Sequence, residues 1–143
     1  MPLELIPLCE IDMTLRQPIF VGNGPRGLRL VIEVEDSTVS GDRIRGQMLG
    51  TATADWVTIV DNVGTVDVRS TFETDDGAVV FCQYSGRINF TNGPGTAPVY
   101  NAPTFETGDE RYRWLNFVQA VGVGTMDETA TALHYEWYEL RAT

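Results

Sequence analysis

The stretch Thr65-Val-Asp-Val-Arg-Ser-Thr-Phe-Glu73 alternates apolar and polar side chains, which is the period of a β-strand. Thr74-Asp-Asp-Gly77 follows it, and a second β-rich run, Ala78–Phe90, begins directly afterwards. Asp-Gly between two such runs is typical of a hairpin with a type I′ turn. These residues therefore predict two antiparallel strands joined by a tight turn.

The rest of the chain repeats this arrangement of short β-rich runs separated by Gly, Pro, Asn and Asp. About eight strands at this spacing favour an antiparallel sandwich or barrel, and a closed barrel leaves no exposed sheet edge. We expect an all-β protein with one antiparallel β-barrel domain over residues 1–143. The predicted strands are Leu3–Leu15, Leu28–Thr38, Arg43–Leu49, Trp56–Val60, Thr65–Glu73, Ala78–Phe90, Tyr112–Val123 and Ala132–Arg141.

The charge of the chain limits its partners. The formal net charge is −10, and all ten basic residues are arginine. Phosphate backbones and anionic membrane surfaces repel a chain this acidic, so we expect neither nucleic acid nor a membrane as partner. No run of about 18 apolar residues is present to span a bilayer. The start of the chain lacks a basic segment and carries Glu4, which argues against a signal peptide and for a cytoplasmic protein.

Cofactor motifs are also missing from the sequence. Without lysine, Schiff-base chemistry and a P-loop are excluded. With His134 as the single histidine, we expect no catalytic zinc site and interpret that residue as structural. The glycines of Gly22-Asn-Gly-Pro-Arg-Gly27 have no helix after them, so a nucleotide site is not expected. We therefore expect no metal and no organic cofactor.

The segment Phe105–Asn116 carries an unusual mixture of side chains. If it continues from the Gly108-Asp109 turn into a strand, then Tyr112, Trp114 and Asn116 share one face. A dry core favours Val, Ile and Leu at such positions, because a buried phenol, indole N–H or amide needs a partner. This mixture is typical of a ligand pocket. Glu106, just before the turn, is either part of that pocket or a partner for a nearby arginine.

Two pairs of residues could complete the pocket. Asp67 and Arg69 share one face of their strand, which is either a solvent-exposed face with weak ion pairs or part of the barrel mouth. Inside the mouth, Arg69 could bind an oxyanion, with Asp67 as orienting group or base. Asp55 either caps a loop or faces a pocket walled by Trp56, where low dielectric would raise its pKa into the range of general acid–base catalysis.

The motifs occur in an order that resembles a known family. They include Asp55-Trp56, Asp67-Val-Arg69, Thr74-Asp-Asp-Gly-Ala78, Tyr84-Ser-Gly86, Phe105-Glu-Thr107 and Tyr112-Arg-Trp-Leu-Asn116. With these the chain resembles the proteins known as domain of unknown function 3237. The resemblance implies a compact single-domain β-barrel, similar in general shape to lipocalins and allene oxide cyclases, that often pairs as a homodimer. It also favours the pocket interpretation for Arg69, Trp114 and Asn116.

The sequence thus predicts a cofactor-free enzyme that acts on a hydrophobic or aromatic carbonyl compound through an enolate. Isomerase, cyclase, hydratase and lyase chemistry all fit side chains that only move protons and stabilise charge. We assign catalysis to Asp55 or Asp67 as base, Tyr112 as donor and Arg69 at the oxyanion. Substrate binding is assigned to Trp56, Trp114, Asn116 and Glu106. The alternative is a non-catalytic carrier or sensor that uses the same cavity.

Overall fold

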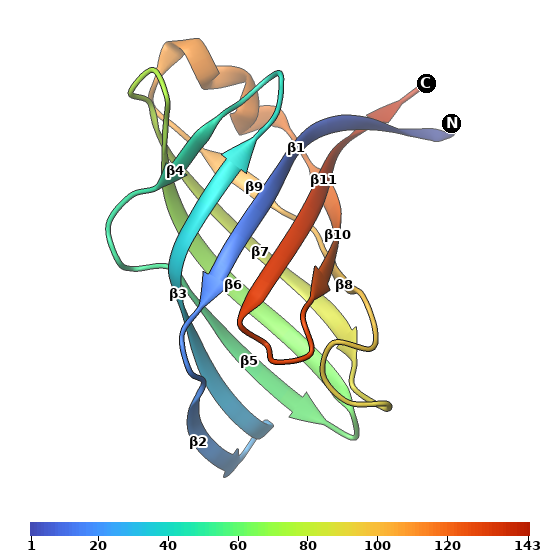
Figure 1. The fold of residues 1–143 in the computed structure, drawn as a ribbon. Coiled ribbons are helices and arrows are strands. Elements are labelled where there is room, and N and C mark those ends of the chain that lie inside the picture. Colours follow the sequence, from blue (N-terminus) through green and yellow to red (C-terminus); the bar gives the residue numbers. More distant parts are fainter.

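Eleven β-strands and one 3₁₀ helix make up the fold, in a computed structural model that describes residues 1–143. Eight strands close a ring in the order β6-β5-β3-β1-β11-β10-β8-β7, and β7 pairs back to β6 (Figure 1). The neighbouring strands are antiparallel throughout, which confirms the expected barrel. The elements are β1 (Leu3–Leu15), β2 (Ile19–Gly24), β3 (Gly27–Ser40), β4 (Gly46–Met48), β5 (Ala54–Val60), β6 (Val63–Thr74), β7 (Val79–Asn89), β8 (Val99–Asn101), β9 (Thr104–Glu106), η1 (Glu110–Phe117), β10 (Ala120–Met126) and β11 (Ala132–Ala142).

Strand β6 shows why the alternating stretch decides this fold. Val66, Val68 and Phe72 are buried, whereas Asp67 and Arg69 between them are exposed. The strand pairs with β7 in an unbroken register along its length. A one-residue slip would turn every apolar side chain outward, so the burial of this face fixes the register.

The turns partly follow the predicted chemistry. Asp61 and Asn62 join β5 to β6 with φ values of 49° and 65°, the left-handed pair that a type I′ turn requires. The type I′ prediction for Asp76-Gly77 is wrong, because Gly77 alone in that turn has a positive φ, of 92°. That turn is instead closed by Thr74, whose hydroxyl accepts a hydrogen bond from the Ala78 N–H.

The predicted strand Tyr112–Val123 is wrong in its first half. Residues Glu110–Phe117 form the 3₁₀ helix η1, and strand β10 begins only at Ala120. The side chain of Asp109 starts the helix by accepting a hydrogen bond from the Arg111 N–H at 2.9 Å. Tyr112, Leu115 and Val118 are spaced by three and pack against the core, so a period of three prevails over the period of two.

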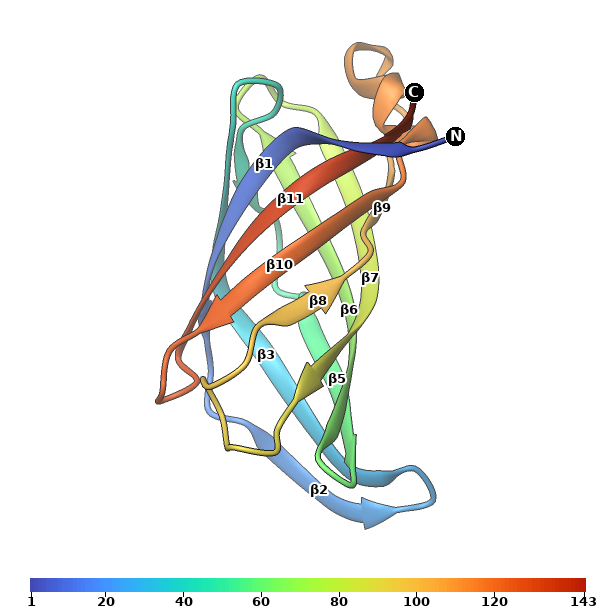
Figure 2. The same cartoon turned by 90° about the vertical axis from the view of Figure 1, so that its right-hand side faces the viewer.

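The two ends of the barrel differ. Figures 1 and 2 show η1 and both chain termini at one end. The β2–β3 hairpin projects from the other end, and the connection between β7 and β8 (residues 90–98) also lies there. We call these the helix end and the hairpin end. Strands β2, β8 and β9 had no counterpart among the predicted strands.

Gly86 allows β8 to approach β7 closely. A methyl group at Gly86 would overlap the Tyr100 backbone carbonyl, which side-chain movement does not relieve. We therefore expect Gly86→Ala to reduce the free energy of unfolding by about 1–3 kcal/mol or more, as overpacking does. Gly108→Ala is the matched control, since no atom lies within 4 Å of its methyl position. Urea unfolding of both variants tests this, and equal stability of the two would contradict it.

Candidate functional site

An apolar cavity of about 60 Å³ lies inside the hairpin half of the barrel. It reaches the strand ends through Leu15, Phe90, Met126 and Leu133, which are only partly buried. Asp55 is the one charged group that lines it. The full lining is Met13, Leu15, Leu30, Ile32, Val34, Asp55, Val57, Val66, Val68, Tyr84, Ile88, Phe90, Val99, Met126, Leu133 and Tyr135.

Asp55 faces the cavity because it shares the inner face of β5 with Val57. Its neighbours across the sheet, Ile32 and Val68, also line the cavity. The β5–β6 pairing is interrupted after Asp55, and the Asp55 carboxylate accepts the Asp67 backbone N–H there at 2.9 Å. A side chain thus replaces a carbonyl in the ladder, and this fixes the orientation of the carboxylate.

Burial raises the pKa of Asp55 to about 6. The hydrogen bond from the Asp67 N–H acts in the opposite direction, and the negative charge of the Asp67 side chain adds to the increase. A carboxyl group with a pKa near 6 can both accept and return a proton at neutral pH. This is the property that a general acid–base catalyst requires.

Two tyrosines complete the polar part of the cavity. The Tyr84 and Tyr135 rings meet edge to face, with centroids 5.5 Å apart. The Tyr84 hydroxyl is buried and makes no hydrogen bond of ordinary geometry, although, besides burial, the neighbouring Tyr135 hydroxyl contributes to the increase in its pKa. Burial raises the pKa of both phenols, so they stay protonated and remain hydrogen-bond donors at neutral pH. Neither tyrosine was among the predicted catalytic residues, although the alternation in Ala132–Arg141 places Tyr135 and Trp137 together on one face.

Asp67, Arg69 and Trp56 lie outside the cavity. Asp67 and Arg69 are on the exposed face of β6, and Arg69 lies over the Trp56 ring at 5.7 Å on the outer surface. The interpretation that placed this pair inside the barrel mouth is therefore wrong, and so is the aromatic wall assigned to Trp56. Strict alternation along β6 is the reason: with Val66 and Val68 inside, Asp67 and Arg69 must be outside.

Tyr112 and Asn116 hold η1 to the helix end of the barrel. The Tyr112 hydroxyl donates to Asp76 Oδ1 at 2.9 Å. Asn116 accepts the Thr107 N–H at 2.8 Å and donates to the Thr107 carbonyl at 2.9 Å. Both side chains are thus engaged at the end opposite the cavity, and the structure does not bring them to Asp55.

Trp114 also anchors the helix. The Arg43 guanidinium lies 4.6 Å from the centroid of its ring and pairs with Glu139 at 2.9 Å. Burial acts to raise the pKa of Glu139, but hydrogen bonds from Arg43 and Arg141 lower it overall. Glu106 is exposed beside η1. Of the eight predicted site residues, Asp55 alone lines the cavity.

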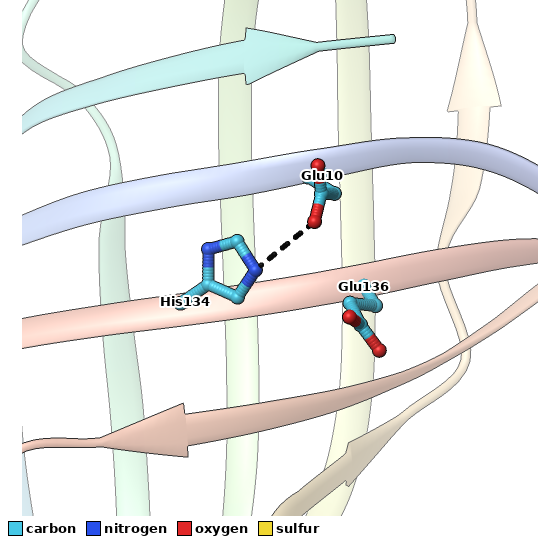
Figure 3. Close-up of side chains that lie close together, drawn as sticks. All are labelled: Glu10, His134 and Glu136. Carbon is cyan, nitrogen blue, oxygen red and sulfur yellow. Dashed lines mark ion pairs between the residues drawn. The ribbon is translucent and has the colours of Figure 1, made fainter.

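His134 belongs to an ion-pair cluster on the outer surface of β1 and β11. Its Nδ1 lies 2.7 Å from Asp12 Oδ1. Its Nε2 lies 3.4 Å from Glu10 Oε1, the ion pair that Figure 3 marks with a dashed line. The hydrogen bond with Asp12 raises the pKa of His134. Glu10, His134 and Glu136 are the residues that could share a cation, with ligand atoms within 4.8 Å of one another. Exposed ion pairs explain this arrangement without a metal.

The two cysteines do not supply a nucleophile. Cys9 and Cys82 are free and buried in the core. Burial raises the pKa of Cys9 to about 12 and that of Cys82 further above its ordinary range. Because the thiolate is the nucleophilic form, both thiols are inert at neutral pH.

Fold and site together define a β-barrel with an apolar inner cavity and one carboxyl group inside it. The chain belongs to the family described as Protein of unknown function (DUF3237), which matches residues 3–140. A UPF0311 protein of Rhodopseudomonas palustris is 35% identical over an alignment of 103 residues, and the match covers 62% of this chain and 66% of the relative. No helix here is both long enough and apolar enough to cross a membrane.

Solved structures share the fold over nearly the whole chain. A β-barrel-like protein from Acinetobacter baumannii has a TM-score of 0.87 at 27% identity, covering 99% of this chain and 98% of its own. A conserved protein of unknown function from Rhodopseudomonas palustris has a TM-score of 0.87 at 26% identity, covering 99% of both chains. A protein from Penicillium herquei, described as an enzyme, has a TM-score of 0.73 at 21% identity, covering 97% and 96%.

The raised pKa of Asp55 makes stability depend on pH. A carboxyl group whose pKa is higher in the folded state lowers stability as pH rises from about 4 to 6, and the full loss persists above that range. Asp55→Asn keeps an oxygen for the Asp67 N–H but does not ionise. At each pH we compare the free energy of unfolding of Asp55→Asn with that of wild type. From pH 4 to pH 8 this difference should shift in favour of the variant by about 2–3 kcal/mol, because only wild type loses stability as Asp55 ionises.

Urea unfolding at both pH values measures this difference, and effects of the substitution that do not depend on pH cancel. The control is Glu106→Gln, which removes an exposed acid at the helix end and should give no such difference. An Asp55→Asn effect of equal size at both pH values would contradict a raised pKa.

Proposed function

We propose that the protein is a cofactor-free enzyme that performs general acid–base catalysis on a hydrophobic carbonyl compound inside the barrel. The observation that carries this proposal is the Asp55 carboxyl group, held by a backbone N–H within an otherwise apolar cavity. A barrel built only for stability would place an apolar side chain there, because taking a carboxylate out of water is costly even at a half-buried position such as this one. Perturbed carboxyl groups in cavities are frequent at catalytic sites.

In the proposed reaction Asp55 is the base and Tyr84 the donor. Asp55 takes a proton from the carbon next to the substrate carbonyl, and the electron pair of the broken C–H bond moves onto the carbonyl oxygen. The Tyr84 O–H donates a hydrogen bond to that developing oxyanion. Asp55 then returns its proton to carbon. The donor role expected for Tyr112 passes to Tyr84, because Tyr112 is bound to Asp76 at the helix end.

Return of the proton to a different carbon gives an isomerisation. In a conjugated enone that carries a hydroxyl, Asp55 takes the hydroxyl proton, the oxygen adds to the β-carbon and the C=C electron pair moves toward the carbonyl oxygen; return of the proton to the α-carbon then completes a cyclisation. Hydration and C–C cleavage can use the same two groups. The cavity of about 60 Å³ is less than half the size of an engineered cavity of about 150 Å³ that binds benzene. A larger substrate therefore enters only after side chains at the hairpin end move, and Met13 and Met126 are suited to this because methionine is flexible.

The second candidate function is a carrier or sensor that uses the same cavity. It is favoured by the single charged group in the lining, since a carrier needs at most one counter-charge. The Penicillium herquei enzyme supports the catalytic alternative only in that this type of barrel occurs in an enzyme; the likeness extends to the fold alone.

Catalysis is tested with 2-indanone, a small aromatic ketone with exchangeable α-protons. We expect wild-type protein to accelerate α-deuterium exchange in D₂O, with a rate that rises as Asp55 ionises near pH 6. Loss of a general base reduces rate by about 10²–10⁴-fold, so Asp55→Asn should lose at least 100-fold. Glu106→Gln should exchange at the wild-type rate. If wild type does not accelerate the exchange, or if Asp55→Asn retains full activity, the assignment of Asp55 as the catalytic base is refuted.

A homodimer remains part of the proposal. Its support is the apolar surface of β2, where Ile19, Phe20 and Val21 are 50%, 70% and 66% exposed. Strand β2 pairs with β3 alone, so its other edge is open to a second chain. Sedimentation should find twice the mass of one chain for wild type and a single chain for Phe20→Ser; a monomeric wild type would refute the dimer.

The cytoplasm is the proposed location. Its support is that Cys9 and Cys82 are both free thiols, as is usual in reducing compartments. Fractionation of cells that express the full chain tests this, and recovery from a secreted fraction would refute it.

A further inference from the structure

Four buried polar atoms have no hydrogen-bond partner; one of them belongs to Tyr84, which lines the cavity, and the other three belong to two residues outside the lining. They are the Tyr84 hydroxyl, the Trp137 Nε1 and both amide atoms of Asn101. The three residues are 4%, 3% and 6% exposed, respectively. An unpaired buried polar group costs about 1–3 kcal/mol, so four such atoms in one barrel require a physical reason. We call these three residues the polar floor.

The polar floor is contiguous. Gly122 on β10 pairs with Asn101 on β8 and with Trp137 on β11. A methyl group at Gly122 would lie 2.5 Å from Asn101 Oδ1 and 2.8 Å from Trp137 Nε1, so both atoms border one point on the barrel wall. The Tyr84 ring packs edge to face on Trp137, with centroids 5.5 Å apart, and Tyr84 itself lines the cavity.

The chemistry of these atoms defines what they can bind. The Tyr84 O–H, the Trp137 Nε1–H and the Asn101 Nδ2–H are donors, and an indole N–H can only donate. The group that satisfies these three donors is an acceptor oxygen; the fourth atom, Asn101 Oδ1, is itself an acceptor and needs a separate donor such as a buried water. The Asp55 carboxylate in the same cavity repels a second negative charge at low dielectric, which excludes a ligand carboxylate. The remaining lining favours an apolar body.

We propose that the polar floor binds the carbonyl oxygen of a neutral, apolar ligand whose body points toward the hairpin end. This inference rests on the proposed function, since the same ligand is the substrate on which Asp55 acts. The carbonyl oxygen lies deepest, against Asn101 and Trp137. Asn101 and Trp137 thereby become binding residues, which the sequence did not indicate. The site should therefore select neutral carbonyl compounds. A hydrocarbon of the same shape leaves the donors of the polar floor without an acceptor, and a carboxylate ligand is repelled by the Asp55 carboxylate.

Three probes with one ring skeleton test this: 2-indanone, indane and indane-2-carboxylate. We expect 2-indanone to bind about tenfold more tightly than indane, the equivalent of one to two net hydrogen bonds, and the carboxylate not to bind. The readout is the ¹⁵N–¹H spectrum of the tryptophan indoles. The Trp137 signal should move at saturation with 2-indanone, because its ring packs on the cavity-lining Tyr84. Trp56, stacked with Arg69 on the outer surface, and Trp114, stacked with Arg43 at the helix end, serve as internal references.

Two variants make the test specific. Asn101→Leu preserves size but removes the amide, so it should weaken 2-indanone binding about fivefold to tenfold and leave indane binding unchanged. Trp137→Phe removes the indole N–H but retains an aromatic ring, so it should also weaken 2-indanone binding. It replaces Asn101→Leu in the test if that variant does not fold. Gln83→Leu, which removes an amide at an exposed position in β7, is the matched control and should bind all probes as wild type does.

The proposal is overturned if 2-indanone does not bind, if it binds no better than indane, or if the Trp137 signal stays fixed at saturation. Buried water would then be what satisfies the floor. Failure of catalysis is separable from these results. If Asp55→Asn and wild type both select 2-indanone over indane but neither exchanges its α-protons, the polar floor is supported and the enzyme is refuted.

Discussion

The hydrogen bond from the Asp67 backbone N–H to the Asp55 carboxylate connects the barrel wall to its cavity. It fills a gap in the β5–β6 ladder, so the sheet stays paired while a charged group faces inward. The same bond stabilises the carboxylate only in part, because burial still raises the pKa of Asp55 to about 6. The position of this one side chain gives an apolar barrel a group that can exchange protons near neutral pH.

The two halves of the barrel differ in how their polar side chains are paired. At the helix end, Trp114, Arg43 and Glu139 form an ion-pair and stacking arrangement that holds η1 against the barrel. At the hairpin end, the cavity reaches partly buried strand ends, and its floor retains unpaired donors. Natural barrels rarely retain such atoms without reason, because each one lowers stability. The unpaired atoms and the raised pKa of Asp55 are the observations on which the proposed function rests.

The sequence predicted the barrel well because burial imposes a strict period of two. Strand β1 has the predicted bounds Leu3–Leu15, and in β6 the alternation alone determines which side chains are inside. The same rule, applied with Val66 and Val68 in the core, also determines that Asp67 and Arg69 are outside. The polar groups of that strand were attractive as site residues, yet their exposure follows directly from the pattern.

Most of the site could not be predicted from the sequence, because it depends on contacts between residues that are far apart in the chain. The segment Phe105–Asn116 fits both a period of two and a period of three, and the choice depends on the Asp109 cap and on contacts with distant residues such as Asp76. The polar floor joins Tyr84, Asn101 and Trp137 from three strands, and the short strand β8 that supplies Asn101 gave no signal of its own. Gly122 is a sequence feature that fits the polar floor, because the missing side chain leaves room for Asn101 and Trp137. The alternation that places Tyr135 and Trp137 on one face of their strand is another.

The most direct test of this account is the titration of the Asp55 carboxyl carbon by ¹³C NMR, in protein labelled at aspartate and assigned with Asp55→Asn. The account predicts a midpoint near pH 6, with a carboxylate that ionises inside the cavity. A midpoint near pH 4, the ordinary value for aspartate, would mean that Asp55 is solvated and that the cavity holds no acid–base group.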